Sequence, residues 1–331
     1  MPPGEQLVEL LRAALATLDE RLPPPRPLEA LPLLSRAVIP LKDYAQPELW
    51  QEAGALLHEL LRGPLDFLLR RLEGNYITDA YGTDPEIIEL FRPLLEFMYY
   101  RWWRVTTEGL DYVPAQGRAL LVSNHSGVLP WDGAMIAASL YLHHSPRLVR
   151  NLFLDWFSKI PVLAPGFTAL GQLSGLHRNA THLLEAEELL CTFPEGVKGI
   201  GKPFKDRYRL ARFGRGGYVQ IALRTGTPII PVAVFGAEEI YPLMGSIDPL
   251  ARLLGMPYFP VTPFFPWLGL LGAMPLPVKW SITFCPPIDT QQYGPQAADD
   301  PLIVFMLNEQ VRHTIQRVLN EKLAARRSLF W

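Results

Sequence analysis

Cysteine is scarce in this chain of 331 residues, which contains only Cys191 and Cys285. Both lie in apolar, strand-like segments without metal-ligand spacing, so we expect neither a disulfide framework nor a metal site. Charge of either sign is not in excess, because 31 Lys and Arg stand against 33 Asp and Glu. The sequence also lacks a nucleic-acid-binding motif, and we therefore expect no nucleic-acid partner.

The N-terminus lacks the basic segment of a secretory signal peptide. It reads MPPGEQLVELLRAAL, with acidic residues where a signal peptide carries lysine or arginine. Together with the scarcity of cysteine, this predicts a cytoplasmic protein.

The chain also lacks an uninterrupted apolar run suited to a membrane-spanning helix. Residues 253–278 carry no charge and are long enough to span a bilayer, but they include six prolines. Four of these recur at every third residue, the period of a polyproline II helix. Two interpretations remain open: the segment packs against the domain, or it forms an apolar surface that contacts lipid.

Two common enzyme signatures are absent or incomplete. No Gly-x-Ser-x-Gly nucleophile elbow occurs anywhere in the chain. Residues 196–202 fit the Gly-x-x-x-x-Gly-Lys part of a P-loop, but Pro203 stands where Ser or Thr should hold magnesium. We therefore do not expect nucleotide hydrolysis.

The pattern of apolar residues changes near residue 105. Residues 1–105 read as helical, and Asp84-Pro85 marks a helix start with an N-cap followed by proline. From 106 onwards, strand-like runs at 119–123, 189–193, 229–236 and 279–284 alternate with helix-like runs near 131–143, 147–158, 178–189 and 215–225. A charged amphipathic helix at 301–327 closes the chain.

This alternation predicts an α/β fold with a central mixed, largely parallel sheet flanked by helices. We divide the chain into a helical N-terminal region, 1–105, and an α/β domain, 106–331. The N-terminal region would serve as a lid, a membrane-docking element or packing. Residues 97–103 hold five aromatic side chains, which suit either a membrane interface or packing of a helix on a sheet.

One histidine stands in a setting that favours chemistry. The stretch LLVSNHSGVLPWDG places His125 in a loop directly after an apolar strand, with Asp132 seven residues later. In α/β sheets, ligands bind at the carboxyl ends of strands. Asp132 is close enough in sequence to orient the imidazole, leaving the other ring nitrogen as a base. With no nucleophile in the chain, this pair would activate an alcohol or water brought in as substrate.

A second candidate stretch follows the strand-like run at 189–193. Pro194-Glu195-Gly196 stands at its end, and seven basic residues occur within the next eighteen positions. They are Lys198, Lys202, Lys205, Arg207, Arg209, Arg212 and Arg215. If this run borders the same sheet edge as His125, it would attract an anionic group of a substrate; otherwise it is a solvated charged face.

These stretches together resemble the glycerolipid acyltransferases, which include the lysophosphatidate acyltransferases and their mono- and diacylglycerol acyltransferase relatives. Asn124-His125 followed by Asp132, the later FPEG at 193–196 and the strand-like PIIPVAV, with Pro231, look like three blocks of that family. The resemblance covers about residues 106–290.

The chain departs from the family pattern in three places. Six residues separate His125 from Asp132 where the family usually has four, as in a longer-loop bacterial branch near the monoacylglycerol acyltransferase-like members. The family's Gly-x-x-Phe-x-x-Arg block is imperfect, with Arg178 one place beyond the expected arginine. Val197-Lys198 replaces the usual Thr-Arg after FPEG, which retains a positive charge without the bidentate fork of arginine.

The resemblance implies acyl transfer from a thioester carrier, acyl-CoA or acyl carrier protein, to a hydroxyl of a glycerolipid-type acceptor. His125 would be the general base and Asp132 its partner, with no covalent acyl-enzyme, no metal and no resident cofactor. The residues expected to bind substrate are Asn124, Arg178, Glu195, Gly196, Lys198, Lys202 and Lys205. Such substrates imply a membrane surface as a partner and a peripheral location on its inner face.

Two alternatives use the same residues differently. A hydrolase would direct the His125–Asp132 pair at water, for instance to cleave acyl thioesters. A non-catalytic lipid-binding protein would retain the fold with a decayed site.

Overall fold

The computed structural model describes residues 68–326, apart from 145–146, 154–162 and 176, together with a few isolated positions before residue 68. The helices expected before residue 68 therefore lie largely outside the described residues. The proposed division of the chain at residue 105 stays a prediction.

Seven strands form the central sheet, in the order β1-β9-β6-β2-β5-β3-β4. Their bounds are β1 (Thr106–Glu108), β2 (Ala119–Ser123), β3 (Val149–Phe153), β4 (Leu173–Ser174), β5 (Leu189–Thr192), β6 (Ile229–Phe235) and β9 (Ser281–Phe284). Every neighbouring pair is parallel except β6 and β9, which run antiparallel. The prediction of a mixed, largely parallel sheet is thus confirmed. A separate antiparallel pair joins β7 (Gly245–Ser246) to β8 (Pro260–Val261).

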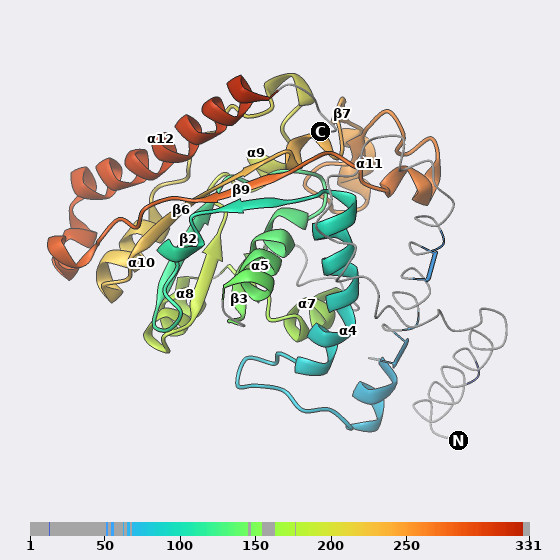
Figure 1. Cartoon of the computed structure of the whole chain (residues 1–331), viewed down its shortest axis with the longest axis horizontal. Helices are drawn as coiled ribbons and strands as arrows, with labels where there is room; N and C mark the ends of the chain where they lie inside the picture. The colour runs from blue at the N-terminus through green and yellow to red at the C-terminus, as the bar shows by residue number, and fades with distance from the viewer. Residues whose placement is uncertain are drawn as a thin grey trace.

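Helices cover both faces of the sheet (Figure 1). The α-helices are α4 (Pro85–Glu96), α5 (Trp131–His143), α7 (Leu163–Ala169), α8 (His177–Glu185), α9 (Val197–Ile200), α10 (Gly217–Thr225), α11 (Asp248–Leu253) and α12 (Pro301–Ala325). Short helices of other types are η3 (Phe97–Trp102), η4 (Leu110–Tyr112), η5 (Phe204–Asp206), η6 (Ala237–Glu239), η7 (Gly269–Ala273), η8 (Gln291–Tyr293) and η9 (Pro295–Asp299). α8, α10 and α12 pack on one face, and α5 and η3 pack on the other.

The central strands are apolar on both faces, as expected for parallel strands covered by helices. Leu120 and Val122 of β2 point into the core beneath α8, α10 and α12. Leu121, between them, points into the core beneath α5 and η3. All five residues of β2 are buried. This alternation fixes the strand's register and therefore the point at which the following loop leaves the sheet.

The aromatic segment after α4 belongs to the interior. Asp84 caps α4 as predicted, because its side chain accepts from the backbone N–H of Glu86 and Ile87. The next six residues continue as a π-helix, and Trp103 after it is fully buried and stacks on Trp280 at 4.5 Å between ring centroids. Of the two interpretations of residues 97–103, the structure confirms packing on the sheet.

One predicted helix is wrong. The helix expected at 147–158 is a strand from Val149 to Phe153, which pairs in parallel with β5. Arg150 is buried, and its charge is compensated because its guanidinium donates to Asp79 at 2.6 Å. A single run of five residues carries no clear period, and the open edge of β5 supplies the pairing that the local pattern did not reveal. Residues 154–158 lie outside the described residues.

Candidate active site

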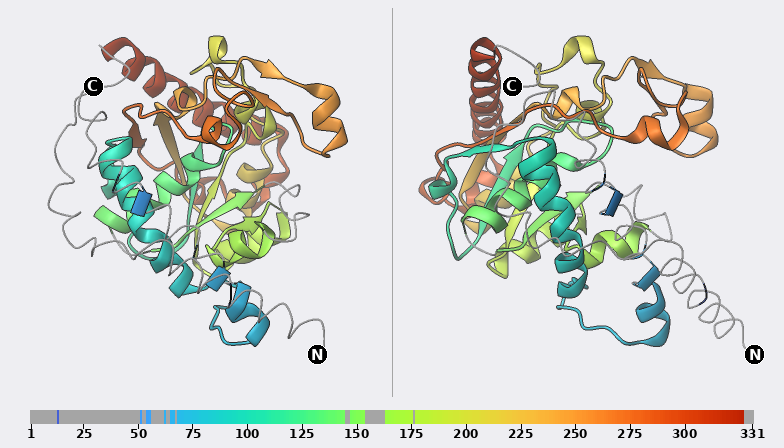
Figure 2. Two further views of the ribbon diagram at one scale, coloured as in Figure 1. Left: turned by 90° about the vertical axis from the view of Figure 1, so that its right-hand side faces the viewer. Right: turned by 45° about the vertical axis from the view of Figure 1, so that its right-hand side comes forward.

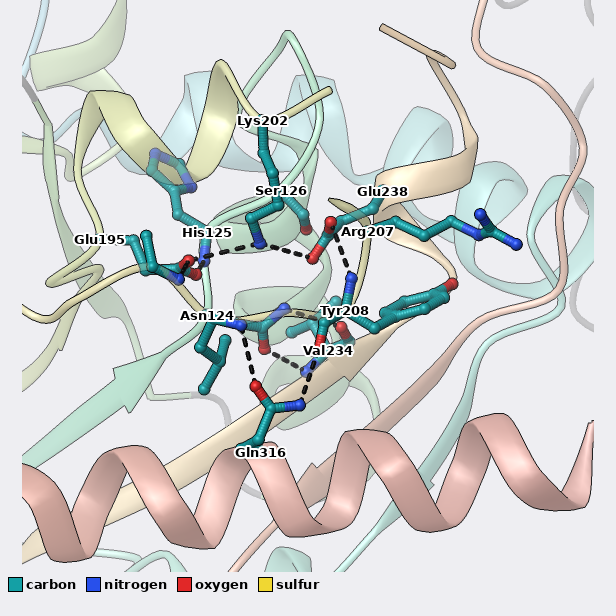
Figure 3. A network of polar contacts seen from close by, with 12 residues as sticks. Asn124, His125, Ser126, Glu195, Lys202, Arg207, Tyr208, Val234, Glu238 and Gln316 are labelled. Atoms are coloured by element: carbon teal, nitrogen blue, oxygen red, sulfur yellow. Dashed lines mark hydrogen bonds and ion pairs between the residues drawn. The ribbon is translucent and has the colours of Figure 1, made fainter. Parts of the chain in front are cut away.

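The histidine loop, which contains His125, follows the carboxyl end of β2 and is fixed there by hydrogen bonds of the preceding residue. The Asn124 side chain donates to the Val234 carbonyl at 2.9 Å and accepts from the Val234 backbone N–H at 2.8 Å. These two bonds join the end of β2 to β6 where the ladder between the strands stops. Asn124 is fully buried, so its amide positions the next residue, His125 (Figure 3).

His125 and Asp132 form a dyad. The Nδ1 atom of His125 lies 2.6 Å from Oδ2 of Asp132. An ionised carboxylate only accepts hydrogen bonds, so Nδ1 donates and Nε2 is left with its lone pair. Asp132 is itself fixed, because it also accepts from the backbone N–H of Ser126 at 2.9 Å and of Gly133 at 2.8 Å. The side chain of Asp132 is fully buried, and that of His125 is 12% exposed.

The longer loop between the two residues still closes. Gly127 has φ +79°, a conformation that glycine adopts without strain. The Trp131 N–H donates to the Leu129 carbonyl at 2.8 Å, and α5 begins at Trp131. Asp132 therefore lies in the first turn of α5, directed back at the end of β2.

The FPEG segment supports the histidine from two sides. The ring of Phe193 stacks on the His125 ring, with 4.5 Å between centroids and 28° between planes. Two residues later, Oε1 of Glu195 accepts the backbone N–H of His125 at 3.0 Å. The parallel strands β2 and β5 end side by side, which brings the FPEG segment and the histidine loop to the same edge of the sheet, as predicted.

A buried ion-pair cluster lies directly behind the histidine. Nζ of Lys202 is 3.3 Å from Oε2 of Glu195 and 3.2 Å from Oε1 of Glu238, which follows the end of β6 (Figure 3). Oε2 of Glu195 also accepts the Ala211 N–H at 2.6 Å, and Glu238 accepts the Tyr208 N–H at 3.1 Å. Burial and the neighbouring Glu195 carboxylate outweigh Lys202 and raise the pKa of Glu238 to about 7.

Glu195 and Lys202 therefore have little surface to offer a ligand. The sequence predicts that both bind substrate, but their side chains are 0% and 7% exposed and engage protein groups. Asn124 is likewise buried. The contacts of these three side chains order the histidine loop and the segment after α9.

Gly199 permits close packing of α9 on the histidine loop. A Cβ at this position would stand 2.8 Å from Cβ of Glu195 and 2.9 Å from both Cβ and the carbonyl oxygen of His125. Side chains do not approach that closely, so only glycine lets the helix lie there. Gly196, at the start of α9, has φ +55° and open space beside it.

Two of the remaining candidates lie at the surface. Lys198 and Lys205 are exposed. Arg178 lies at the second position of α8. In the rest of the basic run, Arg209, Arg212 and Arg215 are exposed, whereas Arg207 lies 3.4 Å from Oε1 of the buried Glu239. The run is therefore divided between internal ion pairs and an exposed cationic face.

Sequence reasoning missed three contributors to the site. Glu238 belongs to no motif that the sequence reveals, although its position shortly after strand β6 could have indicated a role at this edge of the sheet. Phe193 lies in the FPEG stretch and Gly199 in the glycine-containing stretch at 196–202, but their contacts with His125 depend on how α9 folds back. Within the described residues, no group of three His, Cys, Asp or Glu side chains is arranged to hold a metal ion.

Comparison with known proteins agrees with this geometry. The family model described as Acyltransferase matches residues 104–235, which contain the dyad and FPEG. An uncharacterized protein of Mycobacterium tuberculosis is 46% identical over 277 residues, covering 83% of this chain and 77% of the relative. A human protein, "DGAT1/2-independent enzyme synthesizing storage lipids", is 24% identical over 220 residues, covering 66% of this chain and 62% of the relative.

Among solved structures, the 1-acyl-sn-glycerophosphate acyltransferase PlsC of Thermotoga maritima aligns with a TM-score of 0.43 and 16% identity, over 98% of this chain and 97% of that one. The fold is an α/β sheet with the His125–Asp132 pair at the end of a central strand. The chain belongs to the acyltransferase family, and it is an acyltransferase.

Proposed function

We propose that this enzyme transfers a fatty acyl group from acyl-CoA or an acyl carrier protein to a hydroxyl of a glycerolipid-type acceptor, with His125 as general base. The observation that carries the proposal is the 2.6 Å contact of His125 Nδ1 with Asp132, because it directs a free Nε2 toward an incoming hydroxyl.

The reaction needs no nucleophile from the protein. Nε2 of His125 removes the acceptor's hydroxyl proton as the oxygen attacks the thioester carbonyl. The tetrahedral intermediate collapses, the carbon–sulfur bond breaks, and the thiolate takes the proton back from the imidazolium. Asp132 holds the ring and stabilises its positive charge between these two steps. General-base catalysis of this kind contributes about 10²–10⁴-fold in rate.

The other predicted substrate-binding residues divide into three groups in this proposal. Asn124, Glu195 and Lys202 position the histidine loop from behind. Lys198 and Lys205, which are exposed, attract the anionic part of the donor or the acceptor. Arg178 and Gly196 stay as candidates for substrate contact. We place the enzyme in the cytoplasm, at the inner face of a membrane, because its substrates partition there.

The test is an assay with purified protein and a radiolabelled acyl donor, which is either acyl-CoA or the acylated form of an acyl carrier protein. The acceptors are a panel of lysophospholipids and monoacylglycerols. Mass spectrometry separates acylated lipid from free fatty acid. Acylated lipid identifies the acceptor class and supports transfer. Free acid as the single product from every acceptor would contradict transfer and indicate a hydrolase.

Among the described residues, none of the helices combines the length and the apolar character that crossing a bilayer requires.

A further inference from the structure

A group of large apolar side chains is exposed on the segment that follows β6. We call it the apolar platform, and its residues are Met244, Leu253, Leu254, Phe264, Trp267, Leu268, Leu271 and Met274. The most exposed are Leu253 at 80%, Leu271 at 73%, and Met244 and Trp267, each at 69%. Large exposed apolar patches mark surfaces that contact other proteins or membranes. Residues 253–278 therefore combine both interpretations in part, because Val278 packs in the core while Leu253, Trp267 and Leu271 are exposed, and contact of the exposed side chains with lipid stays a prediction.

The platform is an ordered structure and stands out from the body of the molecule. The segment coloured orange, from β7 through η7, lies on the opposite side of the molecule from α12 in the right-hand view of Figure 2. The hydroxyl of Thr262 accepts the backbone N–H of Phe264 and of Phe265, at 3.3 and 2.9 Å. A Cβ on Gly272 would stand 2.4 Å from the Phe264 carbonyl oxygen, so the chain is closely packed beneath the exposed side chains.

The platform is connected to the active site through α9. The Tyr258 hydroxyl donates to the Ile200 carbonyl at the end of α9 at 3.3 Å. The Phe204 N–H donates to the Leu243 carbonyl, one residue before the platform, at 2.8 Å. α9 in turn packs on His125 through Gly199. The segment that carries the platform is therefore hydrogen-bonded to the end of α9, which packs on the histidine loop, and to Phe204 beyond it.

The charges around the platform suit a lipid surface. Leu253 to Val278 contains no charged residue. Exposed cations occur on the elements that are joined to this region: Arg252 on α11, Lys198 on α9 and Lys205 on η5, with Asp206 and Asp248 as carboxylates on the same elements. Exposed aromatic and leucine side chains with cations at the rim are the features of proteins that lie in the interfacial layer of a membrane.

We infer that the apolar platform docks this enzyme on a lipid leaflet and thereby presents the His125 site to acceptor dissolved in that leaflet. The inference deepens the proposed function and rests on it, because a glycerolipid-type acceptor resides in lipid. Trp267, Leu268 and Leu271 enter the interfacial layer, while Lys198 and Lys205 meet anionic headgroups.

The test compares full-length wild type with a triple variant, Trp267→Ser, Leu268→Ser and Leu271→Ser, in sedimentation with vesicles of phosphatidylcholine and phosphatidylglycerol. Removing three exposed apolar side chains should lower the vesicle partition coefficient by at least about 10-fold. A matched triple variant on α12, Leu302→Ser, Phe305→Ser and Met306→Ser, removes comparably exposed side chains far from the platform and should bind as wild type does.

Equal vesicle binding by wild type and the platform variant would overturn the inference. Analytical ultracentrifugation gives a second way to overturn it. If the wild type is a dimer and the platform variant alone is a monomer, the platform faces a second copy of the chain. An activity arm with a short-chain acceptor below its micelle concentration separates the two proposals. If vesicle binding depends on the platform but no acyl transfer occurs, the docking inference stands and the proposed function is refuted. If acyl transfer occurs but vesicle binding does not depend on the platform, the proposed function stands and the docking inference is refuted.

Discussion

The backbone N–H of His125 donates to Oε1 of Glu195 across 3.0 Å, and the same carboxylate holds Lys202 and the Ala211 N–H through its other oxygen. The FPEG segment therefore sets the place of the catalytic loop from behind, while Asp132 sets the ring from the side. Two segments about seventy residues apart in sequence act on one imidazole.

Replacing this carboxylate should disturb both stability and catalysis. In Glu195→Ala, Lys202 keeps one carboxylate but the backbone N–H groups of His125 and Ala211 lose their acceptor. We expect a loss of about 3 kcal/mol in the free energy of unfolding and a lower kcat. Glu195→Gln keeps an acceptor and should lose less of both. Urea denaturation and steady-state kinetics measure the two effects; an alanine variant as stable and active as wild type would refute the role assigned to Glu195.

Asp132 should matter for catalysis far more than for binding. Asn at this position can present an N–H to the ring and stabilise the wrong tautomer, so Asp132→Asn should lower kcat by about 10²–10⁴-fold with little change in KM. Asp299→Asn, an exposed carboxylate paired with Arg224, is the matched control and should leave both constants unchanged. Equal kcat values for the two variants would remove Asp132 from the mechanism.

Gly199 should accept no side chain. In Gly199→Ala, the new Cβ would press on Glu195 and on the backbone of His125, so α9 or the histidine loop must shift. We expect a cost of about 1–3 kcal/mol and at least about a tenfold fall in kcat. Gly166→Ala in α7, where a Cβ meets nothing within 4 Å, should be neutral or stabilising. Thermal unfolding and kinetics compare them, and matching behaviour would contradict the packing argument.

Glu238 should make stability depend on pH. Its pKa is raised from 4.5 to about 7 in the fold, so its contribution to stability is complete below pH 4.5 and is lost as the pH rises through about 7. The shift corresponds to about 3 kcal/mol at most. The unfolding free energy of wild type should therefore fall relative to that of Glu238→Gln between pH 4.5 and 8. A constant difference across this range would show that Glu238 is ionised throughout.

The sequence was sufficient for the parts of the fold that repeat a simple pattern. Strands β2, β5, β6 and β9 are apolar runs between turn residues, and α4 and α12 begin with an Asp cap followed by proline. The dyad was also readable, because the sequence places His125 in a polar loop directly after an apolar strand, with Asp132 seven residues later.

What the sequence could not show depends on contacts between distant segments. Residues Val149–Phe153 form a strand because β5 has a free edge, and no local period indicates it. Glu195 was predicted to bind substrate from the resemblance to the acyltransferases, and Lys202 also because a basic run after a strand suits an anionic ligand. Their burial follows from Glu238, which lies 36 positions beyond Lys202, and pairwise placement of this kind is not encoded in spacing.

The most direct measurement is the acylation assay with His125→Ala beside His313→Ala, whose side chain is 70% exposed on α12. Circular dichroism establishes that both variants are folded. The account predicts that His125→Ala loses acylated lipid by about 10²–10⁴-fold while His313→Ala keeps the wild-type rate. A folded His125→Ala variant that acylates lipid at the wild-type rate would contradict the account.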